Sequence, residues 1–134
     1  MSVAREAMVR EPLALDGSAT AQEAAQHLAE PDVRAVLVCE EGRLTGVVTR
    51  KTLVREVVAL GRDPRATTLA EIAEPPIHTI DADAELESAF RDLEAHDLER
   101  VPVTEPDGKL VGVLSRAVVQ RRLAEDEEPG GGEL

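Results

Sequence analysis

The segment Gly42-Arg-Leu-Thr-Gly-Val-Val-Thr-Arg50 returns 66 residues later as Gly108-Lys-Leu-Val-Gly-Val-Leu-Ser-Arg116. Five of the nine positions are identical, and three more pair Arg with Lys, Val with Leu, and Thr with Ser. Because the whole chain has only 134 residues, a unit repeated at half the chain length predicts one supersecondary element built twice.

The composition narrows the classes of partner. The chain is 43% hydrophobic but has no Trp or Tyr and a single Phe, Phe90, so we expect an aliphatic core. Aromatic platforms for stacking single-stranded nucleic acid are absent, and a net charge of −12 disfavours contact with a phosphate backbone. We therefore expect no nucleic-acid partner.

The sequence also gives expectations for the C-terminal stretch, for the single cysteine and for the location of the protein. The acidic, glycine-rich stretch 124–134 is expected to be a disordered tail. Cys39 lies in an apolar run and is expected to be a buried structural thiol. Neither a leader peptide nor an apolar stretch of about 20 residues is present, so we expect a cytoplasmic protein without membrane contact.

Each copy predicts the order strand, helix, strand, strand, helix. In the first copy we expect a strand at 13–15, a helix capped at Thr20 and stopped at Pro31, strands at 35–39 and 44–49 around a turn at Gly42, and a helix ending at Gly61. The stripe of that last helix is expected to be Leu53, Val54, Val57, Val58 and Leu60. The second copy predicts strands at 77–80, 100–103 and 110–115, a helix at 84–96, and a last helix carrying Val118, Val119 and Leu123.

The aligned copies define the expected domain boundaries. The helices align at an offset of 65 and the strands at 66, so the Pro31 loop is expected to be one residue shorter in the first copy. This alignment equates Arg34 with Arg100 and Val36 with Pro102. The expected parts are an N-terminal segment at 1–8, repeat 1 at 9–61, a linker at 62–71 with a short capped turn at Thr68, repeat 2 at 72–123, and the tail at 124–134.

The duplicated unit resembles a CBS domain (named for cystathionine β-synthase), and the pair resembles a Bateman module. The segments that carry the resemblance are Gly46-Val-Val-Thr49, Gly112-Val-Leu-Ser115 and Arg100-Val-Pro-Val103. The resemblance implies an α/β fold of two copies related by a pseudo-twofold axis, with a central cleft that binds an adenosine-containing ligand. It also implies a regulatory protein that pairs into a homodimeric disc of four CBS units.

The same resemblance implies which residues meet the ligand. Thr49 and Ser115 occupy the family's hydroxyl position at a helix start, where they would face phosphate. The family's ribose-binding Asp is replaced by Thr52 and Val118. The full set of candidate ligand-binding residues is Arg34, Val36, Thr49, Thr52, Ile77, His78, Arg100, Pro102, Ser115 and Arg116. The histidines have no spacing that suggests a metal, so neither a metal nor a cofactor is expected.

Two functions are open at this point. The first is a non-catalytic module that senses AMP, ADP, ATP or S-adenosylmethionine and signals to a separate effector protein. The alternative is a dimerisation or interaction module that has lost its ligand, which the missing Asp in both copies favours. No nucleophile, base and orienting group recur at a spacing typical of an enzyme.

Overall fold

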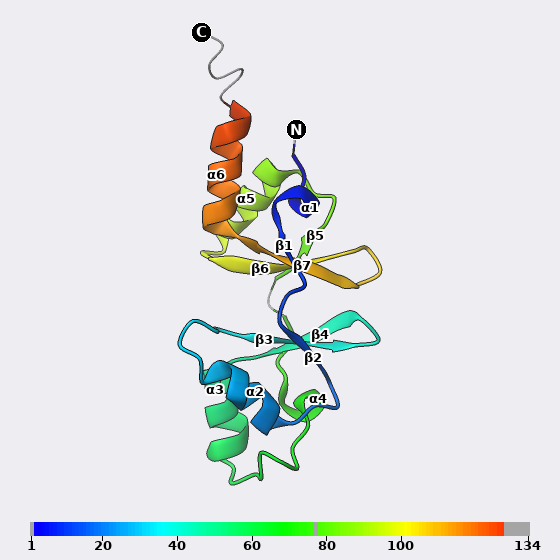
Figure 1. Cartoon of the computed structure of the whole chain (residues 1–134), viewed down its shortest axis with the longest axis vertical. Helices are drawn as coiled ribbons and strands as arrows, with labels where there is room; N and C mark the ends of the chain where they lie inside the picture. The colour runs from blue at the N-terminus through cyan, green and yellow to red at the C-terminus, as the bar shows by residue number, and fades with distance from the viewer. Residues whose placement is uncertain (1, 77, 128–134) are drawn as a thin grey trace. The chain divides into compact units, whose positions relative to one another are not determined.

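The computed structural model describes residues 2–76 and 78–127 (Figure 1). Its contacts divide the chain into two compact units. Unit 2 is the continuous stretch Leu13–Ile77, whereas unit 1 combines Met1–Pro12 with His78–Leu134. Unit 1 is therefore assembled from both ends of the sequence, and each unit is described below by itself.

Unit 2 is a three-stranded sheet with helices packed on it. The sheet has the order β2 (Ala14–Asp16), β3 (Val36–Glu40), β4 (Arg43–Val48), with β2 parallel and β4 antiparallel to β3. The helical segments are α2 (Ala21–Leu28), α3 (Arg50–Leu53), the π-helix η1 (Val54–Val58) and α4 (Leu69–Ile72). The parallel pair β2 and β3 is joined by α2, as a parallel connection requires.

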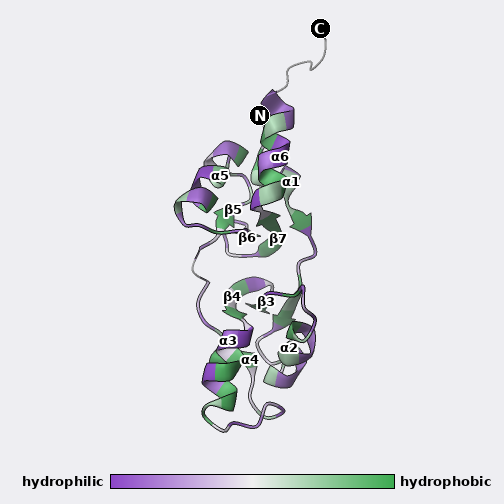
Figure 2. Cartoon of the chain, turned by 90° about the vertical axis from the view of Figure 1, so that its left-hand side faces the viewer, coloured by the Kyte–Doolittle hydropathy of each residue, from purple (hydrophilic) through white to green (hydrophobic). Residues whose placement is uncertain are grey.

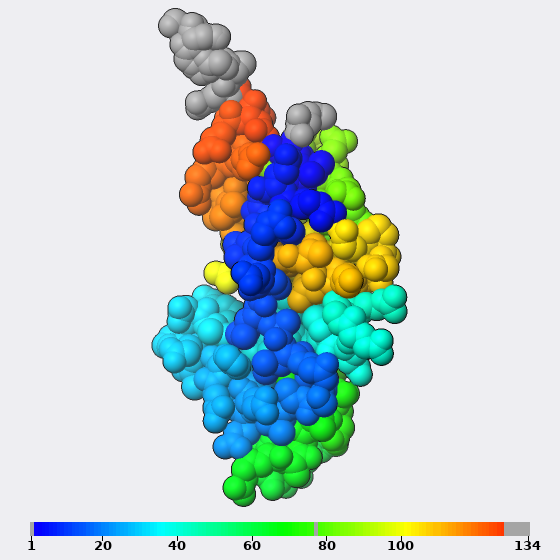
Figure 3. Space-filling model, turned by 45° about the vertical axis from the view of Figure 1, so that its right-hand side comes forward, coloured from blue at the N-terminus to red at the C-terminus, as the bar shows by residue number. Residues whose placement is uncertain are grey.

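Unit 1 repeats that arrangement and adds a strand from the N-terminus. Its sheet has the order β1 (Val9–Arg10), β7 (Leu110–Ser115), β6 (Arg100–Thr104), β5 (Ile80–Asp81). Its helices are α1 (Ala4–Ala7), α5 (Leu86–Ala95) and α6 (Arg116–Glu127). Figure 3 shows the N-terminal residues, in blue, lying against the orange residues of β7 and α6.

The two cores are aliphatic, as the composition predicts. The core of unit 2 consists of Ala21, Ala24, Leu28, Val36, Val38, Val48, Val57, Leu69 and Ile72. The core of unit 1 consists of Ala4, Met8, Ile80, Ala82, Leu86, Ala89, Leu93, Val101, Val103, Leu114 and Val119. The α/β fold of two tandem copies is thus confirmed, and the segment before each copy lies in the core of the opposite unit.

The glycines repeated in the two copies make room for these crossing segments. A Cβ atom on Gly112 would lie 2.6 Å from Met8 Sδ and 2.8 Å from the Val9 carbonyl oxygen. A Cβ atom on Gly46 would lie 2.6 Å from Ala73 Cβ and 3.1 Å from the Glu74 carbonyl oxygen. Contacts under 3.0 Å are sterically forbidden, so the repeated glycine is required by close approach of a second backbone.

Strand register corrects the alignment of the two copies. Val38 pairs with Gly46 and Val103 with Gly112, so β3 corresponds to β6 at an offset of 65. The extra residue lies in the hairpin turn, which has five residues between Thr104 and Leu110 but four between Cys39 and Leu44. The prediction that the Pro31 loop differs in length is therefore wrong, because a one-residue slip would turn the buried side chains of β3 to the other face.

The correction changes which residues are equivalent. Arg100 corresponds to Ala35, and Pro102 corresponds to Leu37. Arg34 instead corresponds to Glu99. The pairing of Arg34 with Arg100, and of Val36 with Pro102, is consequently wrong.

The helix after β4 also departs from the expected pattern. Residues Val54–Val58 form a π-helix, closed by a hydrogen bond from the Ala59 amide to the Val54 carbonyl oxygen. Only Val57 of the predicted stripe is buried, while Val54, Val58 and Leu60 are 57%, 71% and 59% exposed. The stripe is wider than the helix face that meets the sheet, so its outer part is left on the surface. Figure 2 colours part of the ribbon below the α3 label green, for hydrophobic residues. Gly61 ends the helix with a φ of +69°, as predicted.

Three further predictions need correction. The strand expected at 77–80 is only Ile80–Asp81, because the ladder with β6 begins where Ile80 pairs with Val103. Residues 124–127 belong to α6 and are not a disordered tail, since α6 continues to Glu127; the rest of the expected tail lies outside the described residues. Cys39 is half-buried rather than fully buried.

Candidate functional site

In unit 2 the duplicated motif ends in a hydrogen-bonded helix cap. The backbone amide of Thr49 donates to Thr52 Oγ1 at 3.0 Å, and the amide of Thr52 donates to Thr49 Oγ1 at 3.3 Å. The Thr52 hydroxyl, which is 1% exposed, donates to Glu74 Oε1 at 3.2 Å. The capping role expected of Thr49 is confirmed, and Thr52 is anchored to the segment that follows α4.

The hydroxyl protons of this cap have assigned acceptors. Thr52 Oγ1 uses its only proton on the Glu74 carboxylate, so Thr49 must be the donor in the 3.1 Å contact between the two hydroxyl oxygens. Neither oxygen has a second proton to donate. Among the described residues, Thr49 Oγ1 accepts only from the Thr52 amide and keeps one lone pair, whereas Thr52 Oγ1 accepts from both the amide and the hydroxyl of Thr49 and has none left. As arranged, neither threonine can donate to a phosphate oxygen, and only Thr49 can still accept from a group such as a ribose hydroxyl.

Unit 1 presents different chemistry at the corresponding positions. Ser115 Oγ accepts from the Val118 amide at 3.3 Å, which caps α6. Among the described residues the Ser115 hydroxyl donates to no acceptor, so its proton is available to a ligand. Val118 and Val9 stand where Thr52 and Glu74 stand in unit 2. The polar pair is thus replaced by an apolar pair.

Two arginines lie close to Ser115. Arg100 is exposed and is the direct cross-strand partner of Ser115 in the β6–β7 ladder. Within residues 2–76 and 78–127, Arg100 makes no ion pair. Arg116, the first residue of α6, lies 3.6 Å from both Asp97 Oδ1 and Glu99 Oε2, two exposed carboxylates. Ion pairs with such exposed carboxylates are weak, so Arg116 can exchange these partners for another anion.

Several other candidate ligand-binding residues are not part of the group formed by Ser115, Arg100 and Arg116. Val36 is fully buried in the core of unit 2, and Arg34 is exposed on the loop before β3. Pro102 is half-buried on β6, and Ile77 lies outside the described residues. Because Val36 contributes its side chain to the core, it has no surface left for a ligand.

Two hollows within unit 1 differ in how well they suit an anion. One, of about 290 Å³, is lined by Ser2, Glu85, Glu87, Leu123, Asp126 and Glu127. A second, of about 220 Å³, is lined by Glu6, Ala7, Val118, Arg121, Arg122 and Glu125. Four carboxylates surround the first hollow and would repel a phosphate, whereas the second carries Val118 and two arginines.

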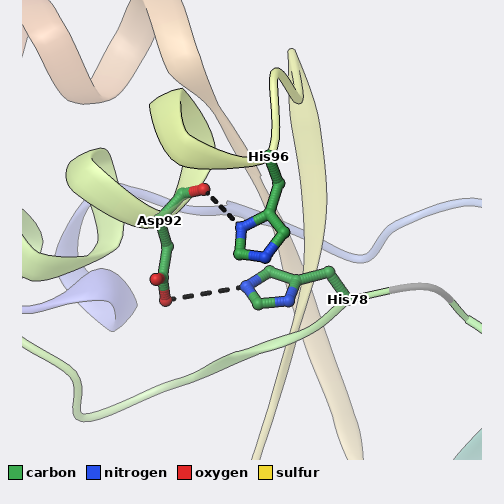
Figure 4. Close-up of side chains that lie close together, drawn as sticks. All are labelled: His78, Asp92 and His96. Atoms are coloured by element: carbon green, nitrogen blue, oxygen red, sulfur yellow. Dashed lines mark hydrogen bonds and ion pairs between the residues drawn. The ribbon is translucent and has the colours of Figure 1, made fainter.

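A group of side chains that the sequence did not suggest lies beside β5. His78, Asp92 and His96 offer ligand atoms within 4.8 Å of one another (Figure 4). Asp92 and His96 are four residues apart on and just after α5, so they share one helix face, while His78 comes from the segment before β5. In the sequence, the four-residue spacing of Asp92 and His96 was the one sign of this group. The approach of His78 to these two residues depends on the fold.

Cys39 does not have the environment of a nucleophile. Burial raises the pKa of its thiol, and the nearby Asp16 carboxylate raises it further. Asp16 and Cys39 are cross-strand partners in the β2–β3 ladder. A thiol held in its protonated form is poorly reactive.

Comparisons with known proteins agree with this geometry. The chain has two α/β units of one topology, each completed by the segment that precedes the other copy, with a capped helix after each glycine-containing strand. The model of the CBS domain matches residues 4–59 and 69–125, which is most of the chain. The chain belongs to the CBS domain family. Each match starts at the short helix, α1 or α4, that lies before its copy.

Individual relatives are similar over nearly their full length. Hypoxic response protein 1 of Mycobacterium tuberculosis is 32% identical over 93% of this chain and 87% of its own. A crystal structure of Hypoxic Response Protein I with two coordinated zinc ions matches with a TM-score of 0.75 over 91% of this chain and 99% of that one. A CBS domain protein from Pyrobaculum aerophilum complexed with AMP is 27% identical, with a TM-score of 0.69 over 92% of this chain and 99% of that one.

No described helix combines the length and the apolar character that crossing a membrane requires.

Proposed function

We propose that the protein is a non-catalytic regulatory module that binds an adenine nucleotide and signals to a separate protein. The phosphate is held in unit 1 by Ser115, Arg100 and Arg116 at the start of α6. The observation that carries this proposal is the direct pairing of Arg100 with Ser115, whose hydroxyl proton has no acceptor among the described residues.

The chemistry of these groups suits a phosphate. Arg100 and Ser115 are paired at one end of the β6–β7 ladder, and α6 begins there with Arg116, so a hydroxyl donor, a helix start and two arginine residues belong to that end. The corresponding end of unit 2 offers two threonine hydroxyls whose protons are already used. Thr49 is therefore assigned to ribose or to the cap, and Thr52, which is buried and fully hydrogen-bonded, to the cap alone. The AMP complex of the relative from Pyrobaculum aerophilum supports adenine nucleotides as the ligand class.

Calorimetry with AMP, ADP, ATP and S-adenosylmethionine tests the proposal on the whole chain. We expect at least one nucleotide to bind and Arg100→Ala to weaken it by about tenfold, as the loss of a charged hydrogen bond implies. Arg91→Ala is the matched control, because Arg91 lies on α5 and its one ion pair among the described residues is with the exposed Glu87. No measurable heat at millimolar nucleotide, or equal effects of both substitutions, would contradict the proposal.

A second candidate is a ligand-free homodimerisation module. The observation that favours it is the exposure of Val54 and Val58 on η1 of unit 2 and of Leu60 in the turn just after it. Exposed apolar side chains gathered in this way are typical of an interaction surface. The absence of an acidic residue at Thr52 and Val118 agrees with loss of the ligand.

The two candidates predict different results. A homodimer built through this surface dissociates in Val58→Glu, as seen by light scattering, while the control Val9→Glu, at another exposed valine, leaves the mass unchanged. If nucleotides raise the melting temperature of the chain, the ligand-free alternative is excluded. An extrinsic dye is needed for that measurement, because the chain lacks Trp and Tyr.

A further inference from the structure

We infer that His78, Asp92 and His96 form a binding site for a divalent transition metal, best matched by zinc. All three belong to unit 1, and their ligand atoms lie within 4.8 Å of one another. Two imidazoles and one carboxylate are a donor set that zinc accepts, with a fourth position left to water. The inference rests on residues of this chain and does not depend on nucleotide binding.

The nitrogen of His78 that faces the group lacks a partner. His78 Nε2 is buried and has no hydrogen-bond partner among the described residues. Asp92 Oδ2 is 3.6 Å away, which is too long for a hydrogen bond but short enough for an ion between the two atoms. Buried polar atoms without a partner are rare in native structures, and a missing ion is one of their common explanations.

His96 is held in the tautomer that metal binding requires. Its Nδ1 lies 2.9 Å from the carbonyl oxygen of Asp92, one helical turn earlier (Figure 4). A carbonyl oxygen can only accept, so Nδ1 carries the proton and Nε2 keeps its lone pair. A backbone carbonyl that accepts from the second ring nitrogen is the usual outer support of a metal-bound histidine.

The three side chains must move closer together when the metal ion binds. The two imidazole rings are stacked, with centroids 4.4 Å apart and planes inclined by 27°, so their faces rather than their lone pairs are directed at each other. Donor atoms around tetrahedral zinc are about 3.3 Å apart. Rotation of the His78 ring, whose Nε2 has no hydrogen bond to lose among the described residues, with a small approach of the half-exposed Asp92 side chain, closes that difference and keeps the His96 hydrogen bond. A bound ion would tie the segment ahead of β5 to the end of α5.

Zinc binding to the chelator-treated whole chain tests the inference. We expect one zinc ion per chain by calorimetry, and at least about tenfold weaker binding in His78→Ala, His96→Ala and Asp92→Asn. His27→Ala is the matched control, because His27 is the remaining histidine and lies on α2 of unit 2. Cys39→Ser controls for binding through the thiol. Both controls are expected to keep the affinity of the original chain.

Two further measurements separate a metal site from a structural role. Zinc should raise the melting temperature of the original chain and of His27→Ala, but not that of His96→Ala, which removes an exposed side chain and so leaves the apo fold intact. In proton NMR spectra, zinc should shift the ring signals of His78 and His96 and leave those of His27 in place. No binding at millimolar zinc, or binding unchanged in His78→Ala and His96→Ala, would overturn the inference.

Discussion

The hydroxyl of Thr52 donates a hydrogen bond to the carboxylate of Glu74 across 3.2 Å, and in the other unit the corresponding positions hold Val118 and Val9. In unit 2 these two equivalent positions therefore hold polar side chains that hydrogen-bond to each other, whereas in unit 1 they hold apolar side chains. The difference separates two roles that the sequence motif alone presents as identical. It also indicates where a carboxylate can be introduced opposite a valine, Val9, instead of opposite a glutamate.

Val118→Asp should strengthen nucleotide binding. The new carboxylate would accept from ribose hydroxyls, and Arg121 and Arg122, which line the same hollow as Val118, would offset its charge. A charged hydrogen bond of about 1.5–3 kcal/mol implies about tenfold or greater affinity. Calorimetry measures the change, with Val118→Leu as the apolar control. Equal affinities of Val118→Asp and Val118→Leu would argue against a ribose at this position.

Gly112→Ala should destabilise the protein by about 1–3 kcal/mol, the usual cost of overpacking. The added Cβ would meet Met8 Sδ at 2.6 Å and the Val9 carbonyl oxygen at 2.8 Å. Urea denaturation followed by circular dichroism measures the loss. The double variant Gly112→Ala with Met8→Ala should not restore stability fully, because the backbone contact remains. An unchanged denaturation midpoint in Gly112→Ala would show that β1 does not cross there.

Deleting residues 1–10 should weaken unit 1 and leave unit 2 intact. The deletion removes Ala4 and Met8 from the core of unit 1 and strips the β1 partner from β7. Burial of the methionine side chain alone is worth about 1.5–3 kcal/mol. Hydrogen exchange measured by NMR should show faster exchange in β7, with the β4 amides of unit 2 as internal control. Equal loss in both strands would contradict the division of the chain.

Ser18→Ala should raise the pKa of Asp16. Ser18 donates to Asp16 Oδ2 from its hydroxyl at 2.7 Å and from its backbone amide at 2.9 Å, and both bonds hold the pKa of Asp16 below 3.8. A lowered pKa stabilises the fold above the unfolded value of about 3.9, and that contribution is lost as the pH falls through the folded pKa. The substitution removes only the hydroxyl bond, so the pKa should move toward 3.8 without passing it.

Carbon-detected NMR of the side-chain carboxyl groups measures this change. The Asp81 signal, from the corresponding turn of the other unit, is the internal control. An Asp16 pKa that does not move would show that the backbone bond alone sets it.

The sequence predicted the elements of the fold well and their mutual register less well. The helix cap at Thr20, the turn at Gly42 and the helix end at Gly61 follow from local chemistry, and all three are confirmed. The alignment of Arg34 with Arg100 was wrong. The two copies differ in length by one residue, and the sequence alone does not say which loop holds the extra residue. Only the ladders that pair Val38 with Gly46 and Val103 with Gly112 place it in the hairpin.

The candidate site was less accessible to sequence reasoning. Val36 was a plausible ligand contact in an apolar strand, but alternation alone does not say which face a core will take. The proximity of His78 to His96 depends on packing between elements that are distant in sequence, and no periodicity reports it. The crossing of each short segment into the opposite unit was likewise invisible, because a linker and a buried strand partner have similar composition.

The division of the chain has a consequence for its synthesis on the ribosome. Unit 2 is one continuous stretch and can fold as soon as residue 77 has left the exit tunnel, whereas the first twelve residues emerge before it and must wait for their partners. The 50 residues from His78 to Glu127 take about 3–10 s to translate at typical rates. During that interval α1 and β1 lack the partners that they have in the finished unit, and β1 pairs with β7, a strand made about 100 residues later.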